Sequence, residues 1–320
     1  MEKGTLLVGE PMGLFIAQNK GPFEDVEGYS MALAGAEFNV AIGMRRLGHP
    51  VGYYTKLGND PFGKRIIKMM NAEAISTDLI QWSDDRFTGF MLKSMVDRGD
   101  PEIFYFRKNS AASTLCAADI CRLDFTDYDA IHMTGITPAL TESTREATET
   151  LLQKARENGM LYTFDPNLRP QLWRDRETMV DYMNQMAGKC DIFMPGIQEA
   201  KILTGTDLPE KIAEFYLKSG AKTVVIKLGD QGAYYATGSQ EGYVPGFQVE
   251  KIVDTVGAGD GFAAGVLTGL KEGLSLEESV RRGNGVGAIQ VMSRGDNDGL
   301  PTRQELGDFM AGKKDWRKGQ

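Results

Sequence analysis

Short apolar runs recur along the chain and alternate with longer stretches that have helical periodicity or helix caps. The apolar runs fall at residues 6–8, 51–54, 130–133, 161–164, 192–194 and 223–228, and the helical stretches at 37–47, 62–73, 141–158 and 208–219. Strands that are apolar on both faces are typical of a mostly parallel sheet covered by helices on both sides. The pattern therefore predicts a three-layer α/β/α sandwich.

Two segments break this alternation. Residues 12–29 lack a helical period, and residues 88–107 predict two strands, 89–96 and 103–107, around a turn at 97–101. We expect these segments to form a small antiparallel β-sheet that stands off the main domain as a lid, with an ordinary edge hairpin as the alternative. No long linker, repeat or low-complexity tract divides the chain. Residues 1–320 therefore predict one domain with an inserted lid.

Composition narrows the classes of function. The 320 residues include 44 acidic and 36 basic side chains, a balance that argues against partners such as nucleic acid or an anionic membrane. Three cysteines without CxxC spacing indicate free thiols, and two histidines make a histidine-based metal site or catalytic triad improbable. No signal-peptide region or membrane-length apolar run is visible. We expect a cytoplasmic protein.

The segment at 254–265, DTVGAGDGFAAG, carries the strongest chemical signal. Small residues at Gly257, Ala258 and Gly259 let backbone N–H groups converge on an anion at the start of a helix, where unpaired amides and a positive dipole end are available. A carboxylate beside an anion is costly, so Asp260 makes sense mainly as a base that takes a proton from a hydroxyl. The simpler alternative is a glycine turn before a tightly packed helix.

This segment resembles the second signature of the ribokinase-like (PfkB-type) carbohydrate kinase family, D-T-x-G-A-G-D-x-F, at every fixed position. The resemblance implies that Gly257, Ala258 and Gly259 form an anion hole and that Asp260 is the catalytic base. It also implies the ribokinase-like fold with ATP and Mg²⁺ as cofactors. A monovalent-cation site beside Asp254 is left open.

Other segments extend the resemblance. Residues 34–41, AGAEFNVA, are similar to the first signature, which implies sugar contacts from Gly35, Glu37 and Asn39, although helix capping alone would explain the pattern. Residues 195–199, PGIQE, resemble the family's N-x-x-E motif, with Gly196 in place of Asn, and imply that Glu199 organises magnesium through water. The residues that the resemblance assigns to the nucleotide are Asn167, Lys227, Gly229, Gly232 and Asn284.

Cationic and aromatic residues indicate the acceptor. Tyr105, Arg107 and Lys108 cluster in the lid, and Arg169 follows a core strand at the sheet edge where open α/β sheets bind ligands. Two guanidinium groups directed at one pocket suit a carboxylate, so we expect a sugar acid. For each arginine taken singly, a surface salt bridge is an equal alternative.

Four further segments resemble the members of the family that phosphorylate the 6-hydroxyl of 2-keto-3-deoxy sugar acids. They are FYFRKNSA at 104–111, TGITPAL at 134–140, DPNLRPQLW at 165–173 and SRGD at 293–296. By this likeness the acid sugar is lined by Gly35, Tyr105, Arg107, Ile136, Arg169 and Asp296. Met91 departs from the pattern, because a relative has a substrate-facing Tyr there.

Several alternatives remain at this stage. A fructokinase or another hexose kinase would accept neutral sugars, and a non-catalytic homologue would sense a sugar without turnover. A dinucleotide oxidoreductase is disfavoured by the lack of an N-terminal G-x-G-x-x-G. The lid positions Phe90, Leu92 and Phe104 are apolar, which indicates a homodimer or higher homo-oligomer through the lid. The expected small-molecule partners are ATP and the sugar acid.

Overall fold

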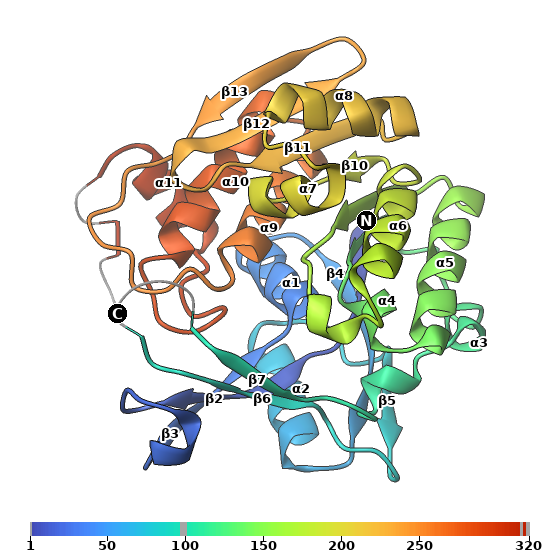
Figure 1. The fold of residues 1–320 in the computed structure, drawn as a ribbon, viewed down its shortest axis with the longest axis vertical. Coiled ribbons are helices and arrows are strands. Elements are labelled where there is room, and N and C mark those ends of the chain that lie inside the picture. Colours follow the sequence, from blue (N-terminus) through green and yellow to red (C-terminus); the bar gives the residue numbers. More distant parts are fainter. Residues whose placement is uncertain (1, 97–100, 314–315, 318–320) are drawn as a thin grey trace.

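The main sheet has the strand order β13-β12-β11-β10-β9-β8-β1-β4-β5 in the computed structural model, which describes residues 2–96, 101–313 and 316–317 (Figure 1). The pairs from β5 to β11 are parallel, whereas β12 and β13 add antiparallel at one edge. The strands are β1 (Gly4–Val8), β4 (Val51–Gly58), β5 (Ile80–Ser83), β8 (Tyr128–Thr134), β9 (Leu161–Asp165), β10 (Ile192–Phe193), β11 (Thr223–Lys227), β12 (Gly232–Thr237) and β13 (Glu241–Pro245).

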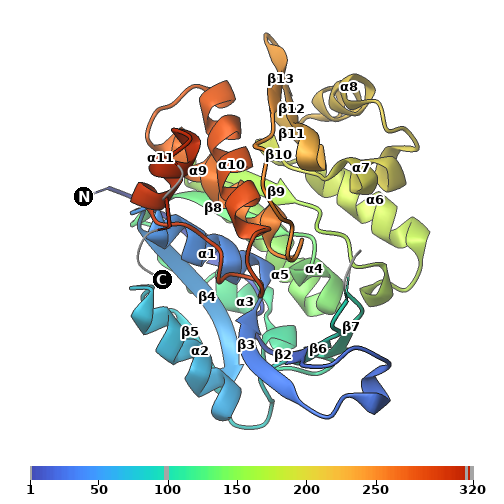
Figure 2. The same ribbon diagram turned by 90° about the vertical axis from the view of Figure 1, so that its left-hand side faces the viewer.

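Helices cover both faces of this sheet (Figure 2). One face carries α1 (Ala36–Arg46), α2 (Pro61–Ala72), α9 (Ala258–Lys271), α10 (Leu276–Gln290) and α11 (Arg303–Met310). The other carries α3 (Ala117–Ile120), α4 (Thr137–Leu140), α5 (Glu142–Glu157), α6 (Arg176–Ala187), α7 (Ile197–Thr204) and α8 (Pro209–Ser219). Short 3₁₀ turns lie at η1 (Phe23–Asp25), η2 (Ala112–Thr114), η3 (Pro170–Leu172) and η4 (Gly229–Gln231).

Alternating side chains of the strands supply the two cores. Leu7 packs with the first group of helices, whereas its neighbours Leu6 and Val8 pack with the second. Tyr53 and Tyr54 divide in the same way, as the period of two in a strand requires. The predicted three-layer sandwich is confirmed, and it brings the carboxyl ends of β1, β8, β9, β10 and β11 to one edge.

A second sheet stands off the main domain near that edge (Figures 1 and 2). Its strands are β2 (Met12–Ala17), β3 (Tyr29–Ala34), β6 (Phe90–Lys93) and β7 (Ile103–Phe106), in the order β3-β2-β6-β7. The pairs β2–β3 and β6–β7 are antiparallel, but β2 and β6 run parallel. The small sheet is thus mixed rather than antiparallel, because β2 and β6, the first strands of its two antiparallel pairs, run parallel to each other. The first segment also extends past the predicted end at residue 29, since β3 continues to Ala34. The turn expected at 97–101 lies outside the described residues, except for Pro101.

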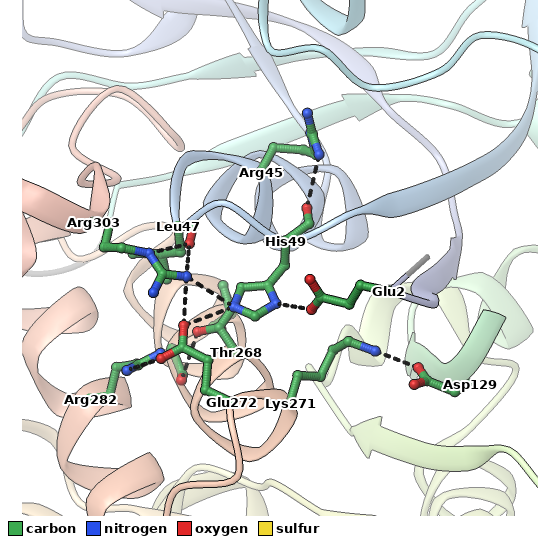
Figure 3. Close-up of polar contacts among 12 residues, drawn as sticks. Glu2, Arg45, Leu47, His49, Asp129, Thr268, Lys271, Glu272, Arg282 and Arg303 are labelled. Atoms are coloured by element: carbon green, nitrogen blue, oxygen red, sulfur yellow. Dashed lines mark hydrogen bonds and ion pairs between the residues drawn. The ribbon is translucent and has the colours of Figure 1, made fainter. Parts of the chain in front are cut away.

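Both histidines have structural surroundings away from that edge. His49 lies between Glu2, 3.1 Å from Nδ1, and Glu272, 2.9 Å from Nε2, where the α1–β4 turn meets α9 (Figure 3). His132 is buried in β8, with Nδ1 2.8 Å from the Thr163 hydroxyl, and burial lowers its pKa to about 3. It is therefore neutral at physiological pH.

Candidate active site

The N-terminus of α9 forms an anion cradle. Its cap residue, Gly257, has φ 78°, and a Cβ there would lie 2.0 Å from the carbonyl oxygen of Asp296, so only glycine fits. Within the described residues, the N–H groups of Gly259 and Asp260 have no hydrogen-bond partner, and that of Ala258 makes only a 3.4 Å bond to Thr255. Free amides at the positive end of a helix dipole suit a phosphate.

Asp260 lies at the first turn of α9 with only 8% of its surface exposed. The side-chain amide of Asn39 donates to Oδ2 at 2.8 Å, and that of Asn167 approaches Oδ1 at 3.4 Å. Burial raises the pKa of Asp260 to about 7, against the opposing effect of the Asn39 hydrogen bond. A carboxylate with a pKa near neutrality is well matched to general-base catalysis.

A cavity of about 550 Å³ opens in front of Asp260, between the lid and the sheet edge. It brings together these residues predicted from the sequence: Gly35, Asn39, Tyr105, Arg107, Ile136, Asn167, Arg169, Glu199, Lys227, Gly257, Gly259, Asp260 and Asp296. Gly35 has φ 138°, and a Cβ on it would lie 2.8 Å from the carbonyl oxygen of Glu10. The turn into α1 therefore reaches the cavity because this residue is glycine.

The two arginines of this cavity have different electrostatic surroundings. Arg107 donates from Nε to Glu10 at 2.7 Å, and both side chains are buried, so its charge is already balanced. Arg169 donates from Nη1 to the backbone carbonyl groups of Leu168 and Asn167, and it forms no ion pair within the part of the chain that the structure describes. Burial opposes the charge of Arg169, but Tyr105 and the nearby carboxylates of Asp260 and Glu199 raise its pKa, so the guanidinium stays charged and can bind an anionic ligand.

A second cavity, of about 330 Å³, lies on the other side of the cradle. It contains the predicted nucleotide residues Lys227, Gly229, Gly232 and Asn284, together with Ala258. Its other lining is largely apolar and includes Phe247, Ile252, Phe262 and Val291. The two cavities share Lys227, Thr255 and Gly259, so they meet at the cradle.

Two predicted residues lie elsewhere than expected. Asn167, which we assigned to the nucleotide, lines the cavity in front of Asp260 instead, because it follows β9 rather than β11. Glu37 does not line either of these cavities: it accepts hydrogen bonds from the Thr134 hydroxyl at 2.7 Å and the Thr137 hydroxyl at 3.2 Å. The turn of α1 directs it into the domain, where it ties α1 to the β8–α4 connection.

Charged groups behind the cradle are tightly paired. The ammonium of Lys227 contacts Asp165 at 2.6 Å. Glu199 accepts N–H bonds of 2.8 Å from both Gly196 and Leu168, and burial raises its pKa despite these bonds and the Lys227 charge. Gly196 thus holds Glu199 through its backbone N–H. This contact does not need the Asn side chain that the family motif has at this position. The described residues contain no cluster of three or more His, Cys, Asp or Glu side chains that could bind a metal directly.

Sequence reasoning missed Glu10, Lys93 and Asp165 as members of this site. Glu10 follows β1 and Asp165 ends β9, so both are acidic residues at the carboxyl edge of a parallel sheet, which is a usable signal. Lys93 lies in an apolar lid strand, and its ammonium is between Asp254 and Asp296.

Among the described helices, none combines the length and the apolar character that a membrane span requires.

Comparison with known proteins identifies this arrangement. Residues 7–303 match the model of the pfkB family carbohydrate kinases. The chain is 46% identical to the 2-dehydro-3-deoxygluconokinase of Bacillus subtilis (strain 168) over 98% of this chain and 97% of that protein. It is 30% identical to a probable fructokinase-4 of Arabidopsis thaliana over 90% of both chains. An E. coli protein described as a ribokinase II, whose structure contains ATP and Mg²⁺, superimposes with a TM-score of 0.88 at 26% identity over 97% of this chain and 99% of that one. This chain belongs to the PfkB family of carbohydrate kinases, phosphotransferases that act on a sugar hydroxyl.

Proposed function

We propose that this enzyme transfers the γ-phosphoryl group of ATP to the 6-hydroxyl of 2-keto-3-deoxygluconate, giving ADP and 2-keto-3-deoxy-6-phosphogluconate. The observation that carries the proposal is the position of Asp260. Its buried carboxyl group, with a pKa of about 7, lies beside unpaired amides at the point where two cavities meet. One cavity contains Arg169, which forms no salt bridge with the other described residues, and the other cavity is lined by glycines and apolar side chains.

The oxygen of the sugar 6-hydroxyl attacks the γ-phosphorus, and Asp260 accepts the proton of that hydroxyl. A new P–O bond forms to the sugar while the bond to the oxygen that bridges the β- and γ-phosphorus breaks, and ADP leaves with that electron pair. General-base assistance of this kind contributes about 10² to 10⁴ in rate. The amides of Gly257, Ala258 and Gly259 stabilise the charge on the transferring group, and losing one such donor costs about 3–4 kcal/mol.

The second cavity suits ATP. Lys227 reaches the shared boundary and would contact the phosphates, while Gly229, Gly232 and Asn284 would border the nucleotide. The flanking apolar side chains suit the adenine ring. Glu199 lines the cavity in front of Asp260 and, with both oxygens held by backbone N–H groups, would organise Mg²⁺ through water. When bound, Mg²⁺ would neutralise phosphate charge.

Arg169 supports a sugar acid over a neutral sugar. The guanidinium of Arg169 is partly buried and has no salt bridge among the described residues, so the carboxylate of the substrate could pair with it through charge-assisted hydrogen bonds. Tyr105 and Asp296 offer hydroxyl and carboxylate contacts in the same cavity, and Arg107 lies with its guanidinium 5.3 Å from the Tyr105 ring centroid. The Bacillus subtilis relative, a 2-dehydro-3-deoxygluconokinase, agrees with this choice.

One assay separates the candidate functions. ATP consumption by the purified enzyme is measured with 2-keto-3-deoxygluconate, its galacto epimer, gluconate, fructose and ribose. We expect the highest kcat/KM with 2-keto-3-deoxygluconate. Preference for fructose would instead identify a hexose kinase, and sugar binding without ATP consumption would identify a non-catalytic sensor. The epimer measures how narrow the specificity is.

We also propose that the enzyme is a homodimer through the outer face of the lid. Phe104 and Phe106 point outward, 54% and 40% exposed, in alternation with the less exposed Ile103 and Tyr105. Phe106 stacks on Phe90 with 4.6 Å between the ring centroids, which extends the aromatic face. Light scattering should give a mass near twice 35.2 kDa, and Phe104→Asp should reduce it to that of one chain. A monomeric wild type would contradict the proposal.

A further inference from the structure

Lys93 connects the lid with the anion cradle. It lies on β6 with 3% of its surface exposed, and its ammonium contacts two carboxylates. Nζ donates to Oδ2 of Asp254 at 2.6 Å and to Oδ1 of Asp296 at 3.2 Å. A buried ammonium is tolerated only with such partners, so this contact holds three separate segments of the chain together.

Both carboxylates belong to segments that shape the cradle. Asp254 accepts the N–H of Val256 at 3.1 Å through Oδ1, one residue before Gly257. The carbonyl oxygen of Asp296 lies so close to Gly257 that a Cβ there would be 2.0 Å away. A displacement of either aspartate would therefore move the amides that begin α9.

The charge balance of this group depends on Lys93. Without the ammonium, Asp254 and Asp296 would face each other as buried carboxylates with 9% and 5% of their side chains exposed. Burial raises the pKa of Asp296, and the Lys93 charge opposes that effect. Like charges in such surroundings repel strongly, because the local dielectric constant is low.

We propose that Lys93 is a positioning residue for phosphoryl transfer, which couples strand β6 of the small sheet to the geometry of the amide cradle. This inference rests on the proposed kinase function.

The test removes the charge while keeping the length of the side chain, with Lys93→Met. We expect kcat with 2-keto-3-deoxygluconate to fall about 10²-fold, because a misplacement of about 1 Å is sufficient for such a loss, while the KM for ATP changes little. Ammonium or methylammonium ions, which can enter the space between the two carboxylates, should restore at least a tenth of the lost rate. The wild type should not respond to these ions or to potassium.

Lys271→Met is the matched control. Lys271 is also a poorly exposed lysine paired with an aspartate, Asp129, but it lies at the far end of α9 (Figure 3). We expect this variant to keep the kcat of the wild type and to show no response to ammonium. A Lys93→Met enzyme that is fully active, or whose lost rate ammonium does not restore, would overturn the inference.

A second variant covers the case in which Lys93→Met does not fold. The double variant Lys93→Met/Asp254→Asn keeps a single carboxylate and should remain folded by circular dichroism. If Lys93 acts through its two carboxylates, the loss from Lys93→Met should be smaller in the Asp254→Asn background than in the wild type, because only the contact with Asp296 remains to be lost; fully multiplicative losses would overturn the inference. Failure of the proposed function is distinguishable, because the wild type itself would then phosphorylate no sugar acid.

Discussion

Asp260→Asn should abolish catalysis and at the same time stabilise the protein. The substitution keeps the shape of the side chain but removes its ability to accept a proton. We expect kcat to fall about 10² to 10⁴-fold while binding of ATP and the sugar acid is retained. Loss of activity together with a gain in stability separates a catalytic role from misfolding, which would lower both.

The stabilisation follows from the raised pKa. The carboxyl group has a pKa of about 7 in the folded chain against 3.8 when solvated. Its ionisation is therefore disfavoured by folding, and stability is lost as the pH rises from about 4 through about 7. The difference between the two pKa values corresponds to at most about 4 kcal/mol above pH 7. Asn carries no charge, so the variant should be more stable than the wild type at pH 8 and similar to it at pH 4.

Two measurements check this reasoning. Urea unfolding at pH 4 and pH 8 gives the stability difference, and the pH profile of kcat/KM gives the pKa of the base. The wild-type rate should rise about tenfold per pH unit below about 7 and level off above it. Asn39→Ala removes the hydrogen bond that lowers the pKa of Asp260, so its profile should move to higher pH. A flat wild-type profile between pH 5 and 8, or an Asp260→Asn protein that turns over normally, would refute the assignment.

Three other substitutions test separate parts of the structure. Arg169→Ala should lower kcat/KM for 2-keto-3-deoxygluconate about 10²-fold by removing charge-assisted hydrogen bonds, with little effect on any activity toward fructose. Arg174→Ala, at an exposed arginine, is the control. Equal losses on both sugars would contradict carboxylate recognition. Gly257→Ala should lower kcat at least about tenfold, because its Cβ would lie 2.0 Å from the Asp296 carbonyl oxygen; unchanged kcat would contradict the cradle. Glu272, whose hydrogen bond from Arg282 lowers its pKa to about 2, stabilises the protein above pH 4.5 and loses that effect as the pH falls toward about 2. Glu272→Gln should therefore destabilise by about 1.5–3 kcal/mol at pH 7 in urea unfolding, and a difference that persists at pH 2 would contradict the ion pair.

The central strands of the fold could be predicted because they are buried on both faces. Residues 130–133 and 161–164 are continuous apolar runs, and the structure places both within parallel strands. The strands β5, β12 and β13 escaped prediction. β5 and β13 lie at the two edges of the sheet and carry mixed residues, whereas β12 is buried but consists of glycine, alanine, tyrosine and threonine rather than an aliphatic run. β13, for example, has exposed positions at Glu241, Tyr243 and Pro245. The strand pairing predicted for the lid was wrong in one respect, because β2 and β6 are parallel. Composition does not reveal which strands of two separate segments will pair.

The site residues likewise divide into those that the sequence could predict and those that it could not. The cradle could be predicted because the whole segment 254–265 resembles a family signature, whereas glycines and a carboxylate at a helix start would by themselves fit a structural turn as well. Glu37 could not be placed, since a single turn of helix decides whether a side chain faces a cavity or the domain interior. The pairing of Arg107 with Glu10 was also invisible, because it joins residues 97 positions apart. Only the folded chain shows that one arginine is balanced and the other is not.

The shared boundary of the two cavities has a consequence for inhibitor design. Because Lys227, Thr255 and Gly259 belong to both, ATP and a sugar acid bound together would lie end to end. One molecule that joins an adenosine polyphosphate to a sugar acid could then occupy both cavities, and linkage raises the effective concentration of each half for its own site. Selectivity among related kinases would come from the sugar-acid half, since Arg169 and the lid would recognise it through side chains, whereas glycine backbone and apolar surface would enclose the nucleotide.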